Sequence, residues 1–371
     1  MTTTCSNAVF RGSAGLIVAF SLATAAGASE ITPQEKKLIP LAKQEGEIIT
    51  LSSLFQDKTV RALEDGFRKR YGLGPDFKYT NIRKGTGPTI STARQEIKAG
   101  RITFDVIVVP GGGFFHGAAE AGAFLPLDSG QWKYHEANAK KANALFEYPH
   151  FVIASSYTFQ PIWNATCPGM ENVNITSYAD ILDPKYKGKT IASDITKSVS
   201  YATTILALQE AGFDVEAMWK KQKAQDPLVA FRTEPKMQMV INCERPIDMW
   251  NLVGRAYQSI EKEPSLAKKL RWGTYKEGQV LLNRQTAVMK GAPHPNAGKL
   301  FIEFLLSKEG LDIVAEREAS LITYREGYTA PESVQKYLID LSKAKVLGVK
   351  SEVEAYKQFK ELRQRWRKVF Q

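Results

Sequence analysis

The stretch QTAVMKGAPHPNAGKLFIEFLLSKEG, residues 285–310, gives the strongest indication of how this chain folds. It begins as a short apolar strand over residues 286–289 and continues through the turn Pro293-His294-Pro295. Because proline cannot donate to a strand partner, the strand must end before this turn. Asn296 is the expected N-cap of a helix whose apolar face then repeats at helical spacing: Ala297, Leu300, Phe301, Phe304 and Leu305. The pattern predicts a strand–turn–helix unit.

Strand and helix patterns also alternate before this unit. We expect strands over residues 47–52 (EIITLS), 77–83 and 104–109 (FDVIVV), with helices over 59–71 and 89–99 between them. A second block is extended over 150–163 and has further strands at 189–194 and 228–233. Such alternation is typical of mainly parallel sheets covered by helices. The 371 residues exceed one comfortable core, so two lobes are expected.

The first 28 residues have the composition of a secretory signal peptide. Arg11 precedes an apolar run at residues 16–22, and Ala26-Gly27-Ala28 offers a small-residue cleavage site before Ser29. The run is shorter than the roughly 20 residues that a membrane-spanning helix needs, and nothing later in the chain has the pattern of a span. We therefore expect a mature protein free in the periplasm.

Two cysteines remain after this segment, Cys167 and Cys243. In an oxidising compartment an even pair is consistent with a disulfide, and closing so long a loop stabilises by roughly 4 kcal/mol. Two separate buried thiols are the alternative. We expect no metal site, because histidine and cysteine do not cluster at ligand spacing.

The formal net charge is +11, and the basic residues are spread along the chain. No basic stripe lies on a nucleic-acid reader module, so nucleic acid is not an expected partner. The charge fits a solvated surface or anionic ligands. The tail at 352–370 places aromatic and aliphatic residues three or four apart, which predicts a helix packed against a lobe.

Catalytic and cofactor motifs are incomplete. Gly188-Lys189-Thr190 resembles the end of a phosphate-binding loop, but Asp183 stands where that loop needs glycine. Gly111-Gly112-Gly113 lacks the last glycine of a dinucleotide fingerprint, where the chain has His116. We therefore predict neither an enzyme nor a cofactor.

Several segments, in this order, resemble bacterial extracellular solute-binding proteins, the ligand-capturing partners of ABC importers. They are residues 92–110 (TARQEIKAGRITFDVIVVP), 124–129 (FLPLDS), 177–190 (SYADILDPKYKGKT) and the Pro293-His294-Pro295 helix. The chain is most similar to the subgroup with the ferric-iron-binding proteins. The resemblance implies a type II periplasmic binding protein fold, with two α/β lobes, a mixed sheet flanked by helices in each, and a ligand cleft closed by a hinge. It also implies a monomer that delivers a small-molecule solute to an inner-membrane permease.

The resemblance further suggests how the chain is divided. Lobe one is expected at residues 45–155 and 288–330, and lobe two at 156–287 and 331–371. The chain is expected to cross between them near residues 109–113, 157–163 and 284–289.

Ligands in such sheets bind beyond the carboxyl ends of strands, at helix N-termini. The candidates on lobe one are Ser52, Ser53, Thr86, Gly87, Gly111 and Gly112. Those on lobe two are Tyr157, Trp163, Asn164, Ser193, Asp194, Ser198, Ser200, Trp250 and Asn251. Arg232 and Arg284 are candidate counter-charges for an anion. Helix capping, core packing and structural ion pairs are the alternatives for these residues.

Ferric-binding relatives carry adjacent tyrosines, because phenolates are hard oxygen ligands. The corresponding segment here, residues 248–259 (DMWNLVGRAYQS), has Trp250, Asn251 and an isolated Tyr257. We therefore expect a small anionic organic solute, held by apolar contacts and charge-assisted hydrogen bonds. The alternatives are a ferric-iron or ferric-chelate binder, an enzyme on the same fold, and a ligand sensor that acts through a receptor.

Overall fold

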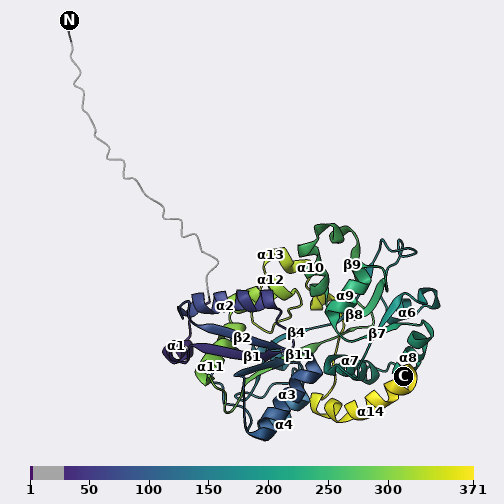
Figure 1. The fold of residues 1–371 in the computed structure, drawn as a ribbon. Coiled ribbons are helices and arrows are strands. Elements are labelled where there is room, and N and C mark those ends of the chain that lie inside the picture. The colour runs from purple at the N-terminus through teal and green to yellow at the C-terminus, as the bar shows by residue number, and fades with distance from the viewer. Residues whose placement is uncertain (3–28) are drawn as a thin grey trace.

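The computed structural model describes residues 1–2 and 29–371, so the predicted signal peptide falls almost wholly outside the described residues. Two five-stranded sheets, each flanked by helices, form two lobes that lie side by side (Figure 1). The two-lobed α/β class predicted from the sequence is confirmed. No helix among the described residues is long and apolar enough to cross a bilayer.

The first sheet has the strand order β2-β1-β3-β11-β4, in which β1 is parallel to β2 and β3, and β11 is antiparallel to β3 and β4. Its strands are β1 (Glu47–Ser52), β2 (Lys78–Arg83), β3 (Val106–Val109), β4 (Val152–Tyr157) and β11 (Leu282–Val288). The central strand β3 is buried on both faces: Val106 and Val108 join one core cluster, and Ile107 and Val109 join the other. This explains why its sequence is continuously apolar.

The second sheet repeats this plan, with the order β7-β6-β8-β5-β9. Its strands are β5 (Gln160–Asn164), β6 (Thr190–Ser193), β7 (Leu228–Ala230), β8 (Ile247–Asn251) and β9 (Leu270–Trp272). A short parallel pair lies apart from both sheets: β10 (Gln279–Val280) and β12 (Val346–Leu347).

Helices cover both sheets. Those of the first lobe are α1 (Pro33–Glu45), α2 (Asp57–Tyr71), α3 (Thr86–Ala99), α4 (Gly112–Glu120), α5 (Glu136–Lys141), α11 (Pro295–Leu306) and α12 (Lys308–Glu318). Those of the second are α6 (Tyr178–Ile181), α7 (Val199–Glu210), α8 (Val215–Ala224), α9 (Thr233–Ile241) and α10 (Val253–Lys262). The C-terminal region adds α13 (Glu332–Gln335) and α14 (Glu352–Phe370). Short 3-10 helices are η1 (Trp132–Tyr134), η2 (Pro184–Tyr186), η3 (Pro264–Lys268) and η4 (Leu341–Lys343).

The strand–turn–helix unit forms as predicted, but its cap differs. The helix begins at Pro295, with His294 at the N-cap position, so Asn296 is already inside the first turn. The carboxylate of Glu45, at the end of α1, accepts hydrogen bonds from the backbone N–H groups of Asn296 (3.1 Å) and Ala297 (2.7 Å). A side chain from another helix therefore supplies the cap, which local sequence cannot reveal.

The chain passes between the lobes after β4, which is in the first sheet, to β5, which is in the second. It returns between β9 and β11. The crossing expected at 157–163 agrees with the first passage. The other two expectations were wrong: residues 109–113 lead into α4 of the first lobe, and residues 284–289 lie within or next to the first sheet. Because β11 starts at Leu282, the second segment of lobe one begins before the expected residue 288.

Helix α14 was expected to pack on lobe two, and it contacts the first lobe as well. It packs on α4 of the first lobe and on α7 and α8 of the second (Figure 1). Its buried stripe consists of Ala355, Phe359, Leu362, Trp366 and Phe370. Amphipathic spacing predicted that the helix packs, but it carries no information on which surface the helix meets.

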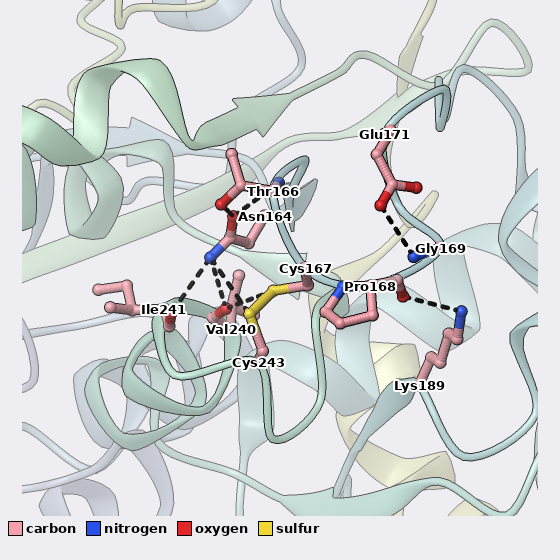
Figure 2. Close-up of a disulfide and its surroundings, with 10 residues drawn as sticks. All are labelled: Asn164, Thr166, Cys167, Pro168, Gly169, Glu171, Lys189, Val240, Ile241 and Cys243. Carbon is pink, nitrogen blue, oxygen red and sulfur yellow. Dashed lines mark hydrogen bonds between the residues drawn. A yellow bond between two sulfur atoms is a disulfide. The ribbon is translucent and has the colours of Figure 1, made fainter.

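A disulfide joins Cys167, in the loop after β5, to Cys243, in the turn after α9 (Figure 2). Beside it, the Asn164 amide donates to the carbonyl of Ile241 at 3.1 Å and accepts from the Thr166 backbone at 3.0 Å. The disulfide and Asn164 therefore fasten the same loop to α9, inside the second lobe.

Candidate ligand-binding cleft

A cavity lies between the lobes where the N-termini of three helices meet. Gly85 and Thr86 bring the start of α3 to it, Lys197 and Ser198 the start of α7, and Arg232 and Thr233 the start of α9. The space is open to solvent, and together with the solvent at its mouth it measures about 660 Å³. No side chain caps α3 or α9, so their first-turn N–H groups are available to a ligand. Helix N-termini carry partial positive charge, so the geometry favours an anion.

The side chains around the cavity are strongly cationic. Its lining includes these basic residues: Arg83, Lys84, Lys197, Arg232, Arg255 and Arg284. Glu234 is the only acid among the described residues that line it. Such an excess of positive charge, enclosed by walls of low dielectric, attracts anions.

Arg284 is the most unusual of these cations. It is on β11 and only 3% exposed, and its guanidinium lies 3.9 Å from the centre of the Tyr157 ring. It donates to Ser155 Oγ at 3.1 Å and to the Ser320 carbonyl at 3.3 Å. The carboxylate of Glu318 attracts the charge of Arg284 electrostatically, but it forms its ion pair with Arg255 instead, at 3.1 Å. Burial lowers the pKa of Arg284 to about 10, so its charge is kept at a cost.

Aromatic side chains form one wall of the cavity. Phe159 lies 4.5 Å from Tyr201 and 5.5 Å from Tyr157, measured between ring centres. Phe231 and Leu252 add further apolar surface. The cavity therefore combines a cationic region with an apolar wall, a combination that suits an organic anion.

The two lobes bond to each other directly around the cavity. Glu234 of α9 pairs with Arg83 at the end of β2 and with Arg255 of α10, the latter at 3.4 Å. Thr86 Oγ1 accepts from the Val199 backbone at 3.1 Å. Burial alone raises the pKa of Glu234, but Arg255 and Arg83 outweigh it and lower the pKa to about 2. These bonds hold the lobes together in a closed arrangement.

The structure gathers several of the predicted site residues around this one cavity. They are Ser53, Thr86, Tyr157, Ser198 and Arg284, together with Ser200 and Arg232. Tyr157 donates to Ser200 Oγ at 2.7 Å, and burial raises its pKa to about 12. They come from both lobes, as a cleft site requires.

The other predicted residues lie outside the cavity lining: Ser52, Gly87, Gly111, Gly112, Trp163, Asn164, Ser193, Asp194, Trp250 and Asn251. Most of their side chains have structural partners. Ser52 bonds to Asn81, Ser193 to Lys236, and Asp194 to Thr196. Asn251 bonds to Asp248, while Trp163 and Trp250 are buried in the core.

The three predicted glycines outside the cavity lining, Gly87, Gly111 and Gly112, are each explained by a turn or a close contact. Gly111 stands at the N-cap of α4 and Gly112 begins the helix, and both line a small cavity beside Glu352 of α14. Gly87 lies against the backbone of Lys197 across the cleft: a Cβ on it would be 3.1 Å from that carbonyl oxygen. It therefore permits the lobes to approach.

Sequence reasoning missed most of the cations. Arg83, Lys84 and Lys197 each lie just before a helix that starts at the cleft, so a basic residue next to a predicted N-cap was a usable signal. Arg255 lies inside α10, and no local pattern distinguishes it from a surface arginine. The positions of Phe159 and Phe231 at the cavity likewise depend on the fold, and no local sequence pattern indicates them.

Residues 65–339 match the family of bacterial extracellular solute-binding proteins. The match covers well over half of the chain, so the protein belongs to this family. A search of curated proteins found no match.

Solved structures of such proteins share the fold. The substrate-binding protein of an ABC transporter from Agrobacterium tumefaciens superposes with a TM-score of 0.74 at 17% identity, covering 88% of this chain and 94% of that one. AfuA from Actinobacillus pleuropneumoniae, with fructose-6-phosphate bound, gives 0.69 at 18% identity, covering 87% and 98%. Iron-bound HitA from Pseudomonas aeruginosa gives 0.67 at 17% identity, covering 87% and 99%.

Proposed function

We propose that the protein is the periplasmic substrate-binding component of an ABC importer, and that it captures a small organic anion. The observation that carries this proposal is Arg284, a buried cation that lines the cleft and has no ion-pair partner among the described residues. A buried charge is costly unless it is paired, and an anionic ligand supplies the missing partner.

The cavity indicates the chemistry of the solute. An anionic group, carboxylate or phosphoryl, fits between Arg284 and the helix N-termini, while an apolar body fits against Phe159, Tyr201 and Phe231. That AfuA holds fructose-6-phosphate supports an organic anion on this fold. Closure of the lobes around the solute then excludes water and strengthens these interactions.

Ferric iron is the rival ligand, because several proteins of this fold bind it. Tyr157 and Tyr201 line the cavity, but the Tyr157 hydroxyl bonds to Ser200, and Tyr201 accepts from Lys236 at 3.0 Å. Burial raises the pKa of both phenols, which opposes phenolate formation. No cluster of three or more His, Cys, Asp or Glu able to hold a metal occurs among the described residues. The side chains therefore favour an organic anion over ferric iron.

The remaining parts of the proposal follow from the family. An extracellular solute-binding protein is exported, which agrees with the signal-like composition of residues 1–28. We infer that the mature chain acts as a monomer in the periplasm, that it binds its solute without turnover, and that the closed form is what the permease receives.

A thermal-shift screen of refolded, ligand-stripped protein tests the proposal. The panel holds aliphatic and aromatic carboxylates, phosphonates, sugar phosphates, neutral sugars, polyamines and ferric citrate. A ligand at a hundredfold over its Kd stabilises by about 2.7 kcal/mol, which raises the Tm of a chain of this size by a few degrees.

We expect stabilisation by one class of organic anion, and none by polyamines or neutral sugars. A ligand-dependent visible charge-transfer band with ferric citrate would instead indicate iron binding. Stabilisation by neutral compounds alone would contradict the anion proposal, and turnover of the hit would reassign the chain to an enzyme.

A further inference from the structure

We propose that Glu352 is a positioning residue for the ligand-binding arginine: from helix α14 it fixes the back of strand β11, whose front carries Arg284 into the cleft. The proposal rests on the ligand-binding role proposed for Arg284. It adds a second function for α14, which otherwise only covers the junction of the lobes.

The Glu352 carboxylate lies against β11 and accepts hydrogen bonds from it. Gln285 Nε2 donates to it at 2.9 Å, and Asn283 Nδ2 donates at 3.4 Å. The other ends of these amides are also fixed. Gln285 Oε1 accepts from the Gly111 backbone at 3.1 Å, and Asn283 Oδ1 accepts from Ser156 Oγ at 2.7 Å. Glu352 therefore completes a network that determines how both side chains of β11 are oriented.

Side chains alternate between the two faces of a strand. Asn283 and Gln285 point to Glu352, whereas Arg284, between them, lines the cleft on the opposite face. The pairing of β11 with β4 also shifts register between Arg284 and Gln285. The extra residue at this shift, Ala154, is on β4, so the ladder beside Arg284 is interrupted. Glu352 holds β11 from its other face through Asn283 and Gln285.

The junction involves both lobes. A small cavity beside Glu352 is lined by Gly111 to Gly113 of α4, by Asn283 of β11, and by Val199 and Thr203 of α7 in the second lobe. Further along, α14 packs on α7 and α8. A rigid helix held at one end by β11 and at the other by the second lobe links the position of the arginine to the position of that lobe.

Glycines at the start of α4 allow Glu352 and its helix to approach closely. A Cβ on Gly112 would overlap the Glu352 carboxylate, and a Cβ on Gly113 would overlap the Tyr356 side chain. The carboxylate also accepts from the Gly112 backbone. By contrast, Gly117, five residues along the same helix, has nothing within 4 Å of the place of a Cβ.

The protonation state of Glu352 affects this network. Burial raises its pKa to about 7, although the hydrogen bonds from Asn283, Gln285 and Gly112 oppose the rise. The ionised carboxylate only accepts hydrogen bonds, whereas the protonated form carries an O–H donor and so holds these three donors less well. The other charged or titratable groups here are Tyr157 and Tyr324, whose pKa values burial raises to about 12, Arg94, stacked on Tyr356, and His116, bonded to Glu120 and Glu147.

Calorimetric titration with sulfate tests the proposal, because sulfate keeps its charge between about pH 6 and about pH 8. The variants are Glu352→Ala, Glu352→Gln, Gly112→Ala and, as a matched control on the same helix, Gly117→Ala. We expect Glu352→Ala and Gly112→Ala to weaken sulfate binding about tenfold at the higher pH. Glu352→Gln weakens it less, since its amide oxygen still accepts from Gln285. Gly117→Ala behaves like the wild type.

The pH profile separates positioning from a merely structural role. In the wild type, and in a His116→Gln variant, the affinity for sulfate rises between about pH 6 and about pH 8, as Glu352 ionises. In Glu352→Gln this rise is absent. A flat wild-type profile, or wild-type affinity in Glu352→Ala and Gly112→Ala, would overturn the proposal.

A ligand-free measurement keeps the proposal separate from the proposed function. Hydrogen exchange of the β11 amides, followed by mass spectrometry at one pH, should be faster in Glu352→Ala and Gly112→Ala and unchanged in Gly117→Ala. If the wild type binds no anion but this pattern holds, the ligand assignment fails and the positioning of β11 by Glu352 stands. Unchanged exchange in all variants would show that Glu352 does not position β11.

Discussion

In the proposed function, Arg284 is the cleft residue on which ligand binding depends most. Its guanidinium is buried, stacked on Tyr157 and without a carboxylate partner among the described residues, so the free protein bears a desolvation cost that a bound anion would relieve. The neighbouring Arg255 shows the contrast, because Glu318 and Glu234 already pair with it. The strength of anion binding should therefore depend far more on Arg284 than on the other arginines.

Replacing Arg284 by methionine should separate binding from stability. We expect the affinity for the anion found in the screen to fall about 10- to 100-fold, the usual loss for a charged hydrogen bond. The free energy of unfolding should change by no more than about 1 kcal/mol, because the removed desolvation cost offsets the lost bonds. Calorimetry and denaturant unfolding measure the two effects. The exposed Arg61→Met variant carries the same change of charge and should keep wild-type affinity.

Glu303 provides a test of stability against pH. It is 2% exposed on α11, and burial raises its pKa from 4.5 to about 7. The folded protein therefore holds a proton that the unfolded chain has released, so stability is lost as the pH rises from about 4.5 to about 7. Glu303→Gln should flatten this fall by up to about 3 kcal/mol in denaturant unfolding.

The same variant series has an internal control. Exposed Glu326→Gln should leave the slope of stability against pH unchanged. Burial raises the pKa of Glu352 in the same direction as that of Glu303. The double variant Glu303→Gln/Glu352→Gln should therefore show an even smaller loss of stability with rising pH. An unchanged slope in Glu303→Gln would show that Glu303 is ionised in the folded state at all these pH values.

At the scale of elements, the starts of α3 and α7 determine how far the lobes close. Thr86 bonds to the first backbone N–H of α7, and Gly87 lies against the Lys197 carbonyl. The contact joins a helix of each lobe end to end, so closure depends on a glycine inside a helix, where glycine is otherwise unfavourable.

Gly87→Ala should therefore change helix stability and closure in opposite directions. The free energy of unfolding should rise by up to about 1 kcal/mol, because alanine is the better helix former. The affinity for the anion should fall about three- to tenfold, since the Cβ presses on the Lys197 carbonyl only when the lobes are closed. Gly117→Ala, in open space on α4, should keep wild-type affinity. Equal affinity in both variants would mean that this contact does not limit closure.

The sequence predicted elements better than it predicted sites, for physical reasons. Strand β1 and helix α14 have the predicted bounds, because periodicity is a local property. The cap of α11 was missed because Glu45 comes from a distant helix. Ser53, just after β1, and Ser198, at the N-cap of α7, were found at the cavity, as was Arg284 within β11. Arg255 could not be found, since it lies mid-helix and only the packing of α10 brings it there.

At the scale of the whole molecule, the two lobes repeat one sheet plan and are held by different means. The first lobe relies on a core shared by α1, α2, α11 and α12, whereas the second also has the disulfide between Cys167 and Cys243. The two cysteines are 76 residues apart in the sequence, and neither lines the cleft. The disulfide should stabilise the second lobe without affecting the ligand.

Replacing both cysteines by alanine should lower the free energy of unfolding by about 4 kcal/mol, the chain-entropy value for a loop of this length. The affinity for the anion should stay within about twofold of the wild type, because the pair does not line the cavity. Denaturant unfolding and calorimetry measure these quantities. Reducing agent should destabilise the wild type to the same extent and leave the variant unaffected. A loss of affinity equal to the loss of stability would link the disulfide to the cleft.

The bonds that join the lobes bear on how much ATP an importer hydrolyses for each solute molecule that it moves. Arg83, Glu234, Thr86 and Val199 bridge the cleft using protein atoms alone. The lobes can therefore be held together without a solute in the cleft. A permease that recognises this closed arrangement would hydrolyse ATP without moving anything. For such a permease, a stronger Arg83–Glu234 pair would mean more ATP hydrolysed without transport when the solute is scarce.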